Sequence, residues 1–164
     1  MMHTATQRGF TLLIAIILAS VALVVGLALA DVAYRQVVLA SAARNSQVAF
    51  YRADSAIECA LYYDQQFAAF NVGNAFDQST LRCEERPLLN YTESSLSDGG
   101  VKTEFGISGA SCAAGQRSAS VTIYKHVSGS CSTSGAKNCI FTSGFSSCSA
   151  TDPNLFERGL KVLY

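Results

Sequence analysis

The chain has 164 residues and a formal net charge of zero, with 12 Lys and Arg against 12 Asp and Glu. This balance provides no basic patch of the kind that indicates nucleic-acid binding, so we expect no nucleic-acid partner. The length leaves room for one long helix and one small domain of about 100 residues. The composition favours a self-associating subunit over a cytosolic enzyme.

An uninterrupted apolar segment lies near the N-terminus. No charged residue occurs between Arg8 and Asp31, and Leu, Ile, Ala and Val dominate the residues between them. A helix of about 20 apolar residues crosses a hydrocarbon layer about 30 Å thick. In lipid a single span must be helical, because only a helix satisfies its own backbone polar groups. The pattern therefore predicts a membrane-spanning helix over residues 10–30.

The residues before this segment, 1–9, form a short polar leader in which Arg8 is the only firm positive charge. A secretory signal peptide would have a shorter apolar core followed by its cleavage site. Here the Arg8-Gly9-Phe10 junction precedes the apolar segment, and this arrangement resembles the processing site of the type IV prepilin family. The resemblance implies that a membrane-bound prepilin peptidase cuts after Gly9 and methylates the new N-terminal residue, Phe10.

One position departs from the pattern of that family. Most type IV pilins carry a glutamate at the fifth mature position, which is Ile14 in this chain. In the family, that glutamate pairs with the terminal amine of a neighbouring subunit and compensates for burying charge in an apolar filament core. The resemblance therefore implies a minor pilin at the tip or at the start of a filament. The alternative is a lineage whose major pilin also lacks the acid.

Residues 31–67 are expected to continue the helix beyond the membrane. Asp31 and Arg35 are spaced for an ion pair one helical turn apart, and neither Pro nor Gly occurs over residues 27–67. Small and apolar residues then recur at helical spacing and predict a stripe that packs on a domain: Ala42, Ala49, Ala53, Ala56, Ala60, Tyr63 and Phe67, broadened by Phe50, Ile57 and Leu61. Most charged residues fall elsewhere on this helix: Arg44, Arg52, Asp54, Glu58 and Asp64.

The rest of the chain divides at about residue 100. Residues 68–100 show no clear periodicity and are expected to form a connecting region with turns. In 101–164, apolar and polar residues alternate in four runs that predict strands, at 101–107, 119–124, 140–142 and 156–164. The predicted fold class is α+β: a long N-terminal helix that packs on a small antiparallel sheet. This is also the pilin architecture.

All six cysteines follow the apolar segment. An even number in a small domain predicts a disulfide framework, with 15 possible connectivities, and an oxidising compartment. Cys131 and Cys139 bracket a polar loop, so we favour a bridge between them. A bridge between Cys59 and Cys83 would tie the connecting region to the helix and leave Cys112 with Cys148. A zinc site is the competing interpretation, but no pair of cysteines is separated by two residues and the only histidine after the leader is His126.

The sequence contains no convincing catalytic or cofactor motif, and we expect neither an enzyme nor a bound cofactor or metal. His126 would have to serve any Ser-His-Asp chemistry, and a histidine at the edge of a core explains it better. Asp54 and Glu58 lie one turn apart and could bind calcium or act as an acid–base pair, but a solvated or subunit-contacting face is the simpler interpretation. No glycine loop has the lysine and the strand-to-helix setting that phosphate binding requires.

These observations together predict a structural subunit of a type IV pilus or a related filament. Its expected partners are other pilin subunits, the prepilin peptidase, an inner-membrane assembly platform and, before assembly, the membrane itself. The precursor is expected to span the inner membrane once with its C-terminal domain outside, and then to enter an extracellular or envelope-spanning filament. Two alternatives remain open: a type II secretion pseudopilin, and a membrane-anchored extracellular binding domain that never polymerises.

Overall fold

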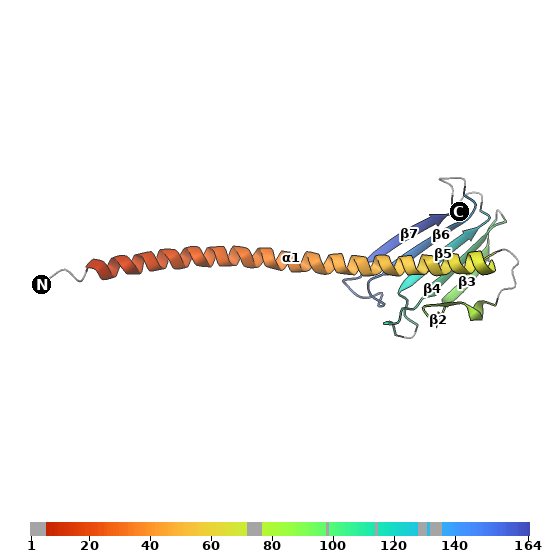
Figure 1. The fold of residues 1–164 in the computed structure, drawn as a ribbon, viewed down its shortest axis with the longest axis horizontal. Coiled ribbons are helices and arrows are strands. Elements are labelled where there is room, and N and C mark those ends of the chain that lie inside the picture. Colours follow the sequence, from red (N-terminus) through yellow and green to blue (C-terminus); the bar gives the residue numbers. More distant parts are fainter. Residues whose placement is uncertain (1–5, 72–76, 98, 114, 128–130, 132–135) are drawn as a thin grey trace. The chain divides into compact units, whose positions relative to one another are not determined.

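The computed structural model describes residues 6–71, 77–97, 99–113, 115–127, 131 and 136–164. The chain divides into two compact units, residues 1–43 and residues 44–164. Its elements in chain order (Figure 1) are α1 (Thr6–Phe67), the 3₁₀ turn η1 (Gln78–Thr80), β1 (Arg82–Cys83), β2 (Arg86–Pro87), β3 (Leu89–Ser95), β4 (Val101–Ile107), β5 (Ala119–Lys125), β6 (Cys139–Phe145) and β7 (Glu157–Leu163).

Helix α1 has no proline and ends where the backbone turns left-handed. Ala68 has a φ of 49°, and its N–H donates a hydrogen bond to the carbonyl oxygen of Asp64 at 3.0 Å. A residue with positive φ just after the last turn is a common way for a helix to stop while satisfying its terminal carbonyls. The C-terminal part of the predicted helix, residues 31–67, is therefore helical to its end.

The sheet in residues 44–164 is antiparallel and has the strand order β3-β4-β5-β6-β7. The alternation predicted for residues 101–107 and 119–124 is present: in β4 and β5 every second residue is buried. The predicted α+β fold is confirmed, because residues of α1 from Ala49 to Ala60 and the buried face of this sheet form the core.

The expectation of a connecting region over residues 68–100 is wrong. It contains β3, an edge strand of the sheet, and β1 and β2, which form a separate two-stranded ladder. Strand β3 is largely exposed and polar, so it has no continuous apolar face to produce a periodic signal. The turn between β1 and β2 places Glu84 and Glu85 at φ of 53° and 63°, where Asn-Gly is the usual signal for such a hairpin.

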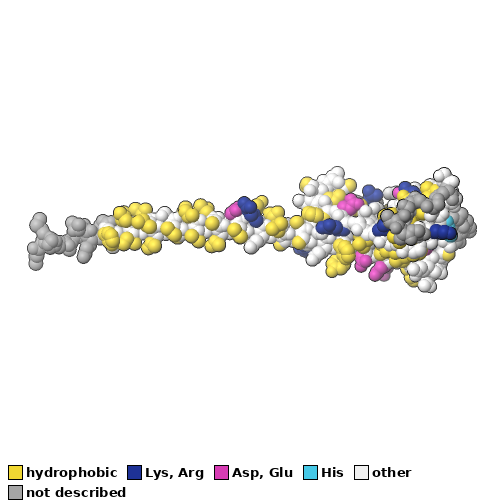
Figure 2. Space-filling view, turned by 90° about the horizontal axis from the view of Figure 1, so that it is seen from above, with side chains coloured by type: hydrophobic (Ala, Val, Ile, Leu, Met, Phe, Trp, Pro, Cys, Tyr) yellow, Lys and Arg dark blue, Asp and Glu magenta, His cyan; other side chains and the backbone are white. Residues whose placement is uncertain are grey.

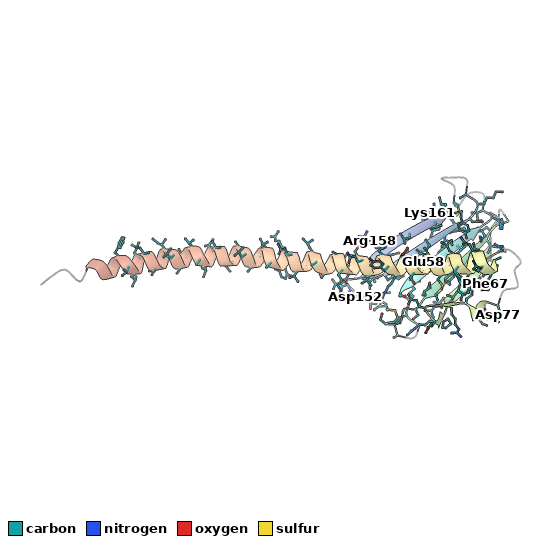
Figure 3. All side chains as sticks on the ribbon, in the orientation of Figure 1. Glu58, Phe67, Asp77, Asp152, Arg158 and Lys161 are labelled. Carbon is teal, nitrogen blue, oxygen red and sulfur yellow. A yellow bond between two sulfur atoms is a disulfide. The ribbon has the colours of Figure 1, made fainter. Side chains whose placement is uncertain are left out.

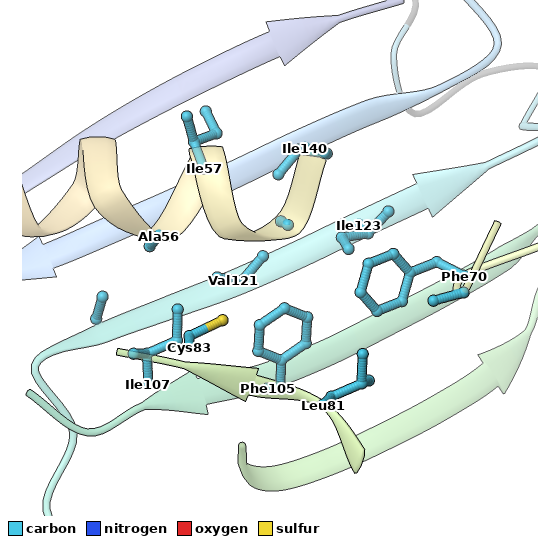
Figure 4. Packing of buried hydrophobic residues seen from close by; sticks show 13 residues of the cluster. Ala56, Ile57, Phe70, Leu81, Cys83, Phe105, Ile107, Val121, Ile123 and Ile140 are labelled. Atoms are coloured by element: carbon cyan, nitrogen blue, oxygen red, sulfur yellow. The ribbon is translucent and has the colours of Figure 1, made fainter. Parts of the chain in front are cut away.

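The hydrophobic core lies between α1 and the sheet (Figure 4). Ile57 from the helix, Val121 and Ile123 from β5 and Ile140 from β6 are all buried in it. After the helix ends, the chain returns Phe70 to the same core, where its ring stacks on that of Phe105 with centroids 5.8 Å apart. The helix therefore acts as the cover for one face of the sheet.

Along its axis, the helix meets the sheet through small residues. Ala49, Ala53 and Ala60 have no exposed surface, and the first two face β6 at Gly144. A Cβ atom built on Gly144 would lie 2.0 Å from the carbonyl oxygen of Ala49 and 2.4 Å from the backbone nitrogen of Ala53. The Thr142 hydroxyl donates a hydrogen bond to the Ala53 carbonyl at 3.0 Å. Helix and strand backbones therefore touch directly at this point.

We predict that Gly144→Ala destabilises the domain by at least about 2 kcal/mol, because the added methyl group collides with helix backbone that cannot rotate away. Near-UV circular dichroism during urea unfolding of the full chain in detergent measures the loss. Gly159→Ala is the matched control, since its Cβ would meet the Thr142 carbonyl at an ordinary 3.6 Å. Equal stability of the two variants would contradict the direct backbone contact.

Candidate functional site

The predicted processing junction lies inside the first turns of α1. Gly9 and Phe10 are both helical, and the Phe10 side chain is 67% exposed. Leader residues 1–5, and the side chains of 6–9, lie outside the described part of the structure. The helix thus presents the junction at the start of the apolar segment without a change of secondary structure at Gly9.

The apolar segment itself is exposed throughout. Every side chain from Phe10 to Ala30 is solvent-exposed in the structure, Ile14 included. Hydrophobic side chains cover the face of this segment that Figure 2 shows. The first charged residues after it, Asp31 and Arg35, form an exposed ion pair at 3.0 Å. The helix is long and apolar enough to cross a membrane, and an exposed apolar surface of this extent requires lipid or protein to cover it.

The six cysteines form three disulfides: the favoured bridge between Cys131 and Cys139 is present, and the other four cysteines pair in the way the sequence suggested. Cys59–Cys83 joins α1 to β1, Cys112–Cys148 joins the loop after β4 to the loop after β6, and Cys131–Cys139 closes the loop that precedes β6. No cysteine is left free. Each bridge restricts the unfolded chain and so stabilises the domain.

A buried polar cluster that the sequence did not predict lies at the C-terminal end of α1. The Lys125 ammonium at the end of β5 lies 2.6 Å from Asp64 Oδ2, with side chains 6% and 3% exposed respectively. The Tyr164 hydroxyl donates a hydrogen bond to the same oxygen, and Lys125 also lies 4.9 Å from the centroid of the Tyr164 ring. These three groups connect the helix to two strands through charge rather than apolar contact.

We predict that Lys125→Met costs about 3–5 kcal/mol of stability, because it leaves the Asp64 carboxylate buried without its cation. Combining it with Asp64→Asn should recover part of that loss, since no buried charge then remains. Lys102→Met is the control: Lys102 pairs with Glu104 at 2.8 Å, but the side chains are 29% and 48% exposed, and such pairs contribute less than about 1 kcal/mol. If Lys125→Met and Lys102→Met cost the same in urea unfolding, the cluster has no special role.

Two tyrosines of the domain have raised pKa values. Burial, followed by the negative charge of Glu93, raises the pKa of Tyr91 to about 12. Burial, followed by the hydrogen bond to Asp64, raises the pKa of Tyr164 above its ordinary value. Below pH 10 the folded and unfolded chains both hold these phenolic protons, whereas at higher pH the unfolded chain releases them first. Stability is therefore lost as the pH rises through this range.

We predict that the melting temperature falls between about pH 10 and pH 12, and that Tyr91→Phe makes this fall shallower because one of the late-titrating phenols is removed. Thermal unfolding followed by near-UV circular dichroism at a series of alkaline pH values measures the slope. Tyr51→Phe is the control, since that side chain is 68% exposed. An unchanged slope in Tyr91→Phe would show that its ionisation is not linked to folding.

The residues considered for catalysis do not come together. His126 is exposed, with a φ of 55°, and its backbone N–H donates a hydrogen bond to Asn138 Oδ1 at 3.1 Å. Asp54 and Glu58 remain on α1, where Glu58 is exposed (Figure 3). Within the described ranges, no group of three or more His, Cys, Asp or Glu residues is placed to hold a metal ion.

The surface of residues 44–164 has a groove of about 430 Å³ between α1 and the edge strand β7. On α1 it is lined by the exposed aromatic residues Phe50 and Tyr51, and on β7 by Arg158, Gly159 and Leu160. The guanidinium Nε of Arg158 donates a hydrogen bond to the Ser46 hydroxyl at 2.8 Å. The groove therefore combines apolar rings with one fixed cation at an unpaired sheet edge.

Comparison of the chain with protein-family models, curated proteins and solved structures finds no match.

Proposed function

We propose that this protein is a structural subunit of a type IV pilus or a related filament, processed after Gly9 and assembled through its N-terminal helix. One observation carries the proposal: a wholly exposed apolar helical segment, residues 10–30, directly follows the Arg8-Gly9-Phe10 junction. A helix that only anchored a domain would need the apolar segment but not that junction. The resemblance to type IV prepilins implies that this junction is a peptidase processing site.

Packing of the apolar segment provides the free energy for assembly. Because the segment leaves lipid rather than water, close van der Waals packing against neighbouring helices drives its association, and side chains from Phe10 to Leu29 have large exposed areas to pack. Small residues along the same segment allow helices to approach closely: Ala15, Ala19, Ser20, Ala22, Gly26, Ala28 and Ala30. Nothing lies within 4 Å of a Cβ built on Gly26, so this surface is open to a neighbouring helix.

Ile14 supports a minor or tip position within the filament. After cleavage, the ammonium group of Phe10 would need a carboxylate partner in an apolar filament core. Between Arg8 and Asp31 this chain has no acidic residue, so it offers no such partner to a neighbouring subunit. A subunit at the end of the filament has a neighbour on one side only and can dispense with one such pair.

We also propose partners for this subunit and its location in the cell. A prepilin peptidase removes the leader, an inner-membrane platform drives assembly, and other pilin subunits receive the helix. The three disulfides favour a domain that lies outside the cytoplasm. Before assembly the precursor is held in the inner membrane by a single span, with this domain on the outer side. The groove beside β7 provides an apolar surface for a lateral neighbour.

We predict that the mature protein begins with an N-methylated Phe10, and that Gly9→Val blocks its maturation because the peptidase requires the small residue at the junction. Intact-mass spectrometry of protein from cells that have the peptidase distinguishes the two forms. Gly26→Ala is the matched control, since its added methyl group meets nothing and should leave processing unchanged. Wild-type protein that retains Met1 would contradict the filament proposal and leave a membrane-anchored domain.

Shearing of the cells then separates the remaining alternatives. A pilus subunit appears in sheared fibres in the supernatant, whereas a type II secretion pseudopilin is processed in the same way but stays in the envelope. A processed protein found only as a monomer in the membrane fraction would contradict both filament functions.

A further inference from the structure

A polar cavity of about 300 Å³ lies at the side of the sheet that α1 does not cover. Its lining comes from three strands: Asn90 from β3, Glu104 and Gly106 from β4, and Ser120 and Thr122 from β5, with Arg117 from the preceding loop. Phe105 and Val121 also line the cavity, but their side chains belong to the core that the helix covers. Because neighbours in a strand alternate between faces, Glu104, Ser120 and Thr122 point away from it.

Two departures from regular sheet geometry and a glycine coincide at this cavity. The register between β3 and β4 shifts between Leu89 and Thr92, which marks a bulge. Asn90 lies within the bulge at a φ of 50°, so its side chain is turned out of the ordinary alternation. Gly106, the partner of Leu89, leaves the floor of the cavity open. Bulges and positive-φ residues of this kind often re-aim side chains at functional sites.

The polar groups in the cavity are available to a ligand. In the described part of the chain, no side-chain hydrogen bond engages Asn90, Arg117, Ser120 or Thr122. Glu104 supplies a carboxylate that Lys102 holds at 2.8 Å, and Arg117 supplies a guanidinium. The lining therefore offers both hydrogen-bond donors and acceptors.

An aromatic wall adjoins the polar groups. The guanidinium carbon of Arg117 lies 5.5 Å from the centroid of the Phe145 ring, a cation–π contact that orients it. Arg117 and Phe145 also line a second cavity of about 100 Å³, together with Ala150 and Leu155. Arg117 thus stands between a polar cavity and an apolar one on the same side of the domain.

We propose that this pair of cavities binds a neutral saccharide. Sugar hydroxyls each donate and accept hydrogen bonds, which matches the amide, carboxylate, guanidinium and hydroxyl groups of the lining. The C–H face of a sugar ring is apolar and suits the Phe145 side. An apolar ligand is disfavoured by the polar lining. The proposal goes beyond filament assembly and does not depend on it.

The test is direct binding to the full-length protein in a detergent that contains no sugar, such as lauryldimethylamine oxide. Ligand-observed NMR with glucose, galactose, mannose, N-acetylglucosamine, N-acetylgalactosamine and lactose serves as the neutral panel, and inorganic phosphate and N-acetylneuraminic acid as the anionic probes. We expect millimolar binding of at least one neutral sugar. Asn90→Gly should weaken it about tenfold, since it removes the amide at a backbone position that glycine accepts.

A second variant fills the cavity without removing a polar group. Gly106→Val should also weaken binding about tenfold or more, because its Cβ fits at 3.5 Å from Leu89 and Arg117 and its methyl groups occupy the floor. Gly159→Val, the same change in a strand outside these cavities, should bind as the wild type does. The proposal is overturned if no neutral sugar binds, if Asn90→Gly and Gly106→Val bind as tightly as the wild type, or if only the anionic probes bind.

Discussion

The domain depends on the direct contact between the backbone of α1 and the backbone of β6. Ala49 and Ala53 leave no side chain large enough to separate the helix from the sheet, and Gly144 contributes none from the other side. The helix axis is thereby fixed at one height above the strand, and the larger apolar residues fill the space on both sides of this line. The small residues at helical spacing therefore have two effects: they allow the helix to be buried, and they set where it crosses the sheet. They determine which strand the helix crosses.

Because the helix is fixed at this point, its last turns deliver specific groups to specific places. Cys59 reaches β1 and forms a disulfide, and five residues later Asp64 reaches Lys125 and Tyr164 at the ends of two strands. The ion pair and the hydrogen bond demand a narrow geometry, and a buried carboxylate tolerates little displacement from its partners. The apolar contact therefore positions the helix, and the polar cluster and the disulfide hold its end in register with the sheet.

The sequence predicts this fold where side chains repeat regularly and fails where they do not. The buried alternation of β4 and β5 is visible because both strands are central, whereas β3 lies at an edge with a polar sequence and carries no such signal. Asp64 was grouped with the charged residues that lie off the packing stripe. Its partner, Lys125, is 61 residues away, so the sequence gives no hint that the two meet. The sequence does not predict the polar cavity either, because a bulge and the absence of a side chain at Gly106 create it.

The two units of the chain pose different physical problems. The core clusters, the disulfides and the buried ion pair all lie within residues 44–164, so that unit has its own sources of stability. Residues 10–30 have no such internal contacts. They are uniformly apolar and exposed, and as a helix they are stabilised by the lipid or protein around them. In the proposed assembly, residues 10–30 leave lipid and pack against neighbouring helices. Because this segment has no charged side chain, no charge has to be moved from one apolar environment to the other. This transfer does not require residues 44–164, the disulfide-bonded unit, to refold. The proposed assembly depends on that unit keeping its fold.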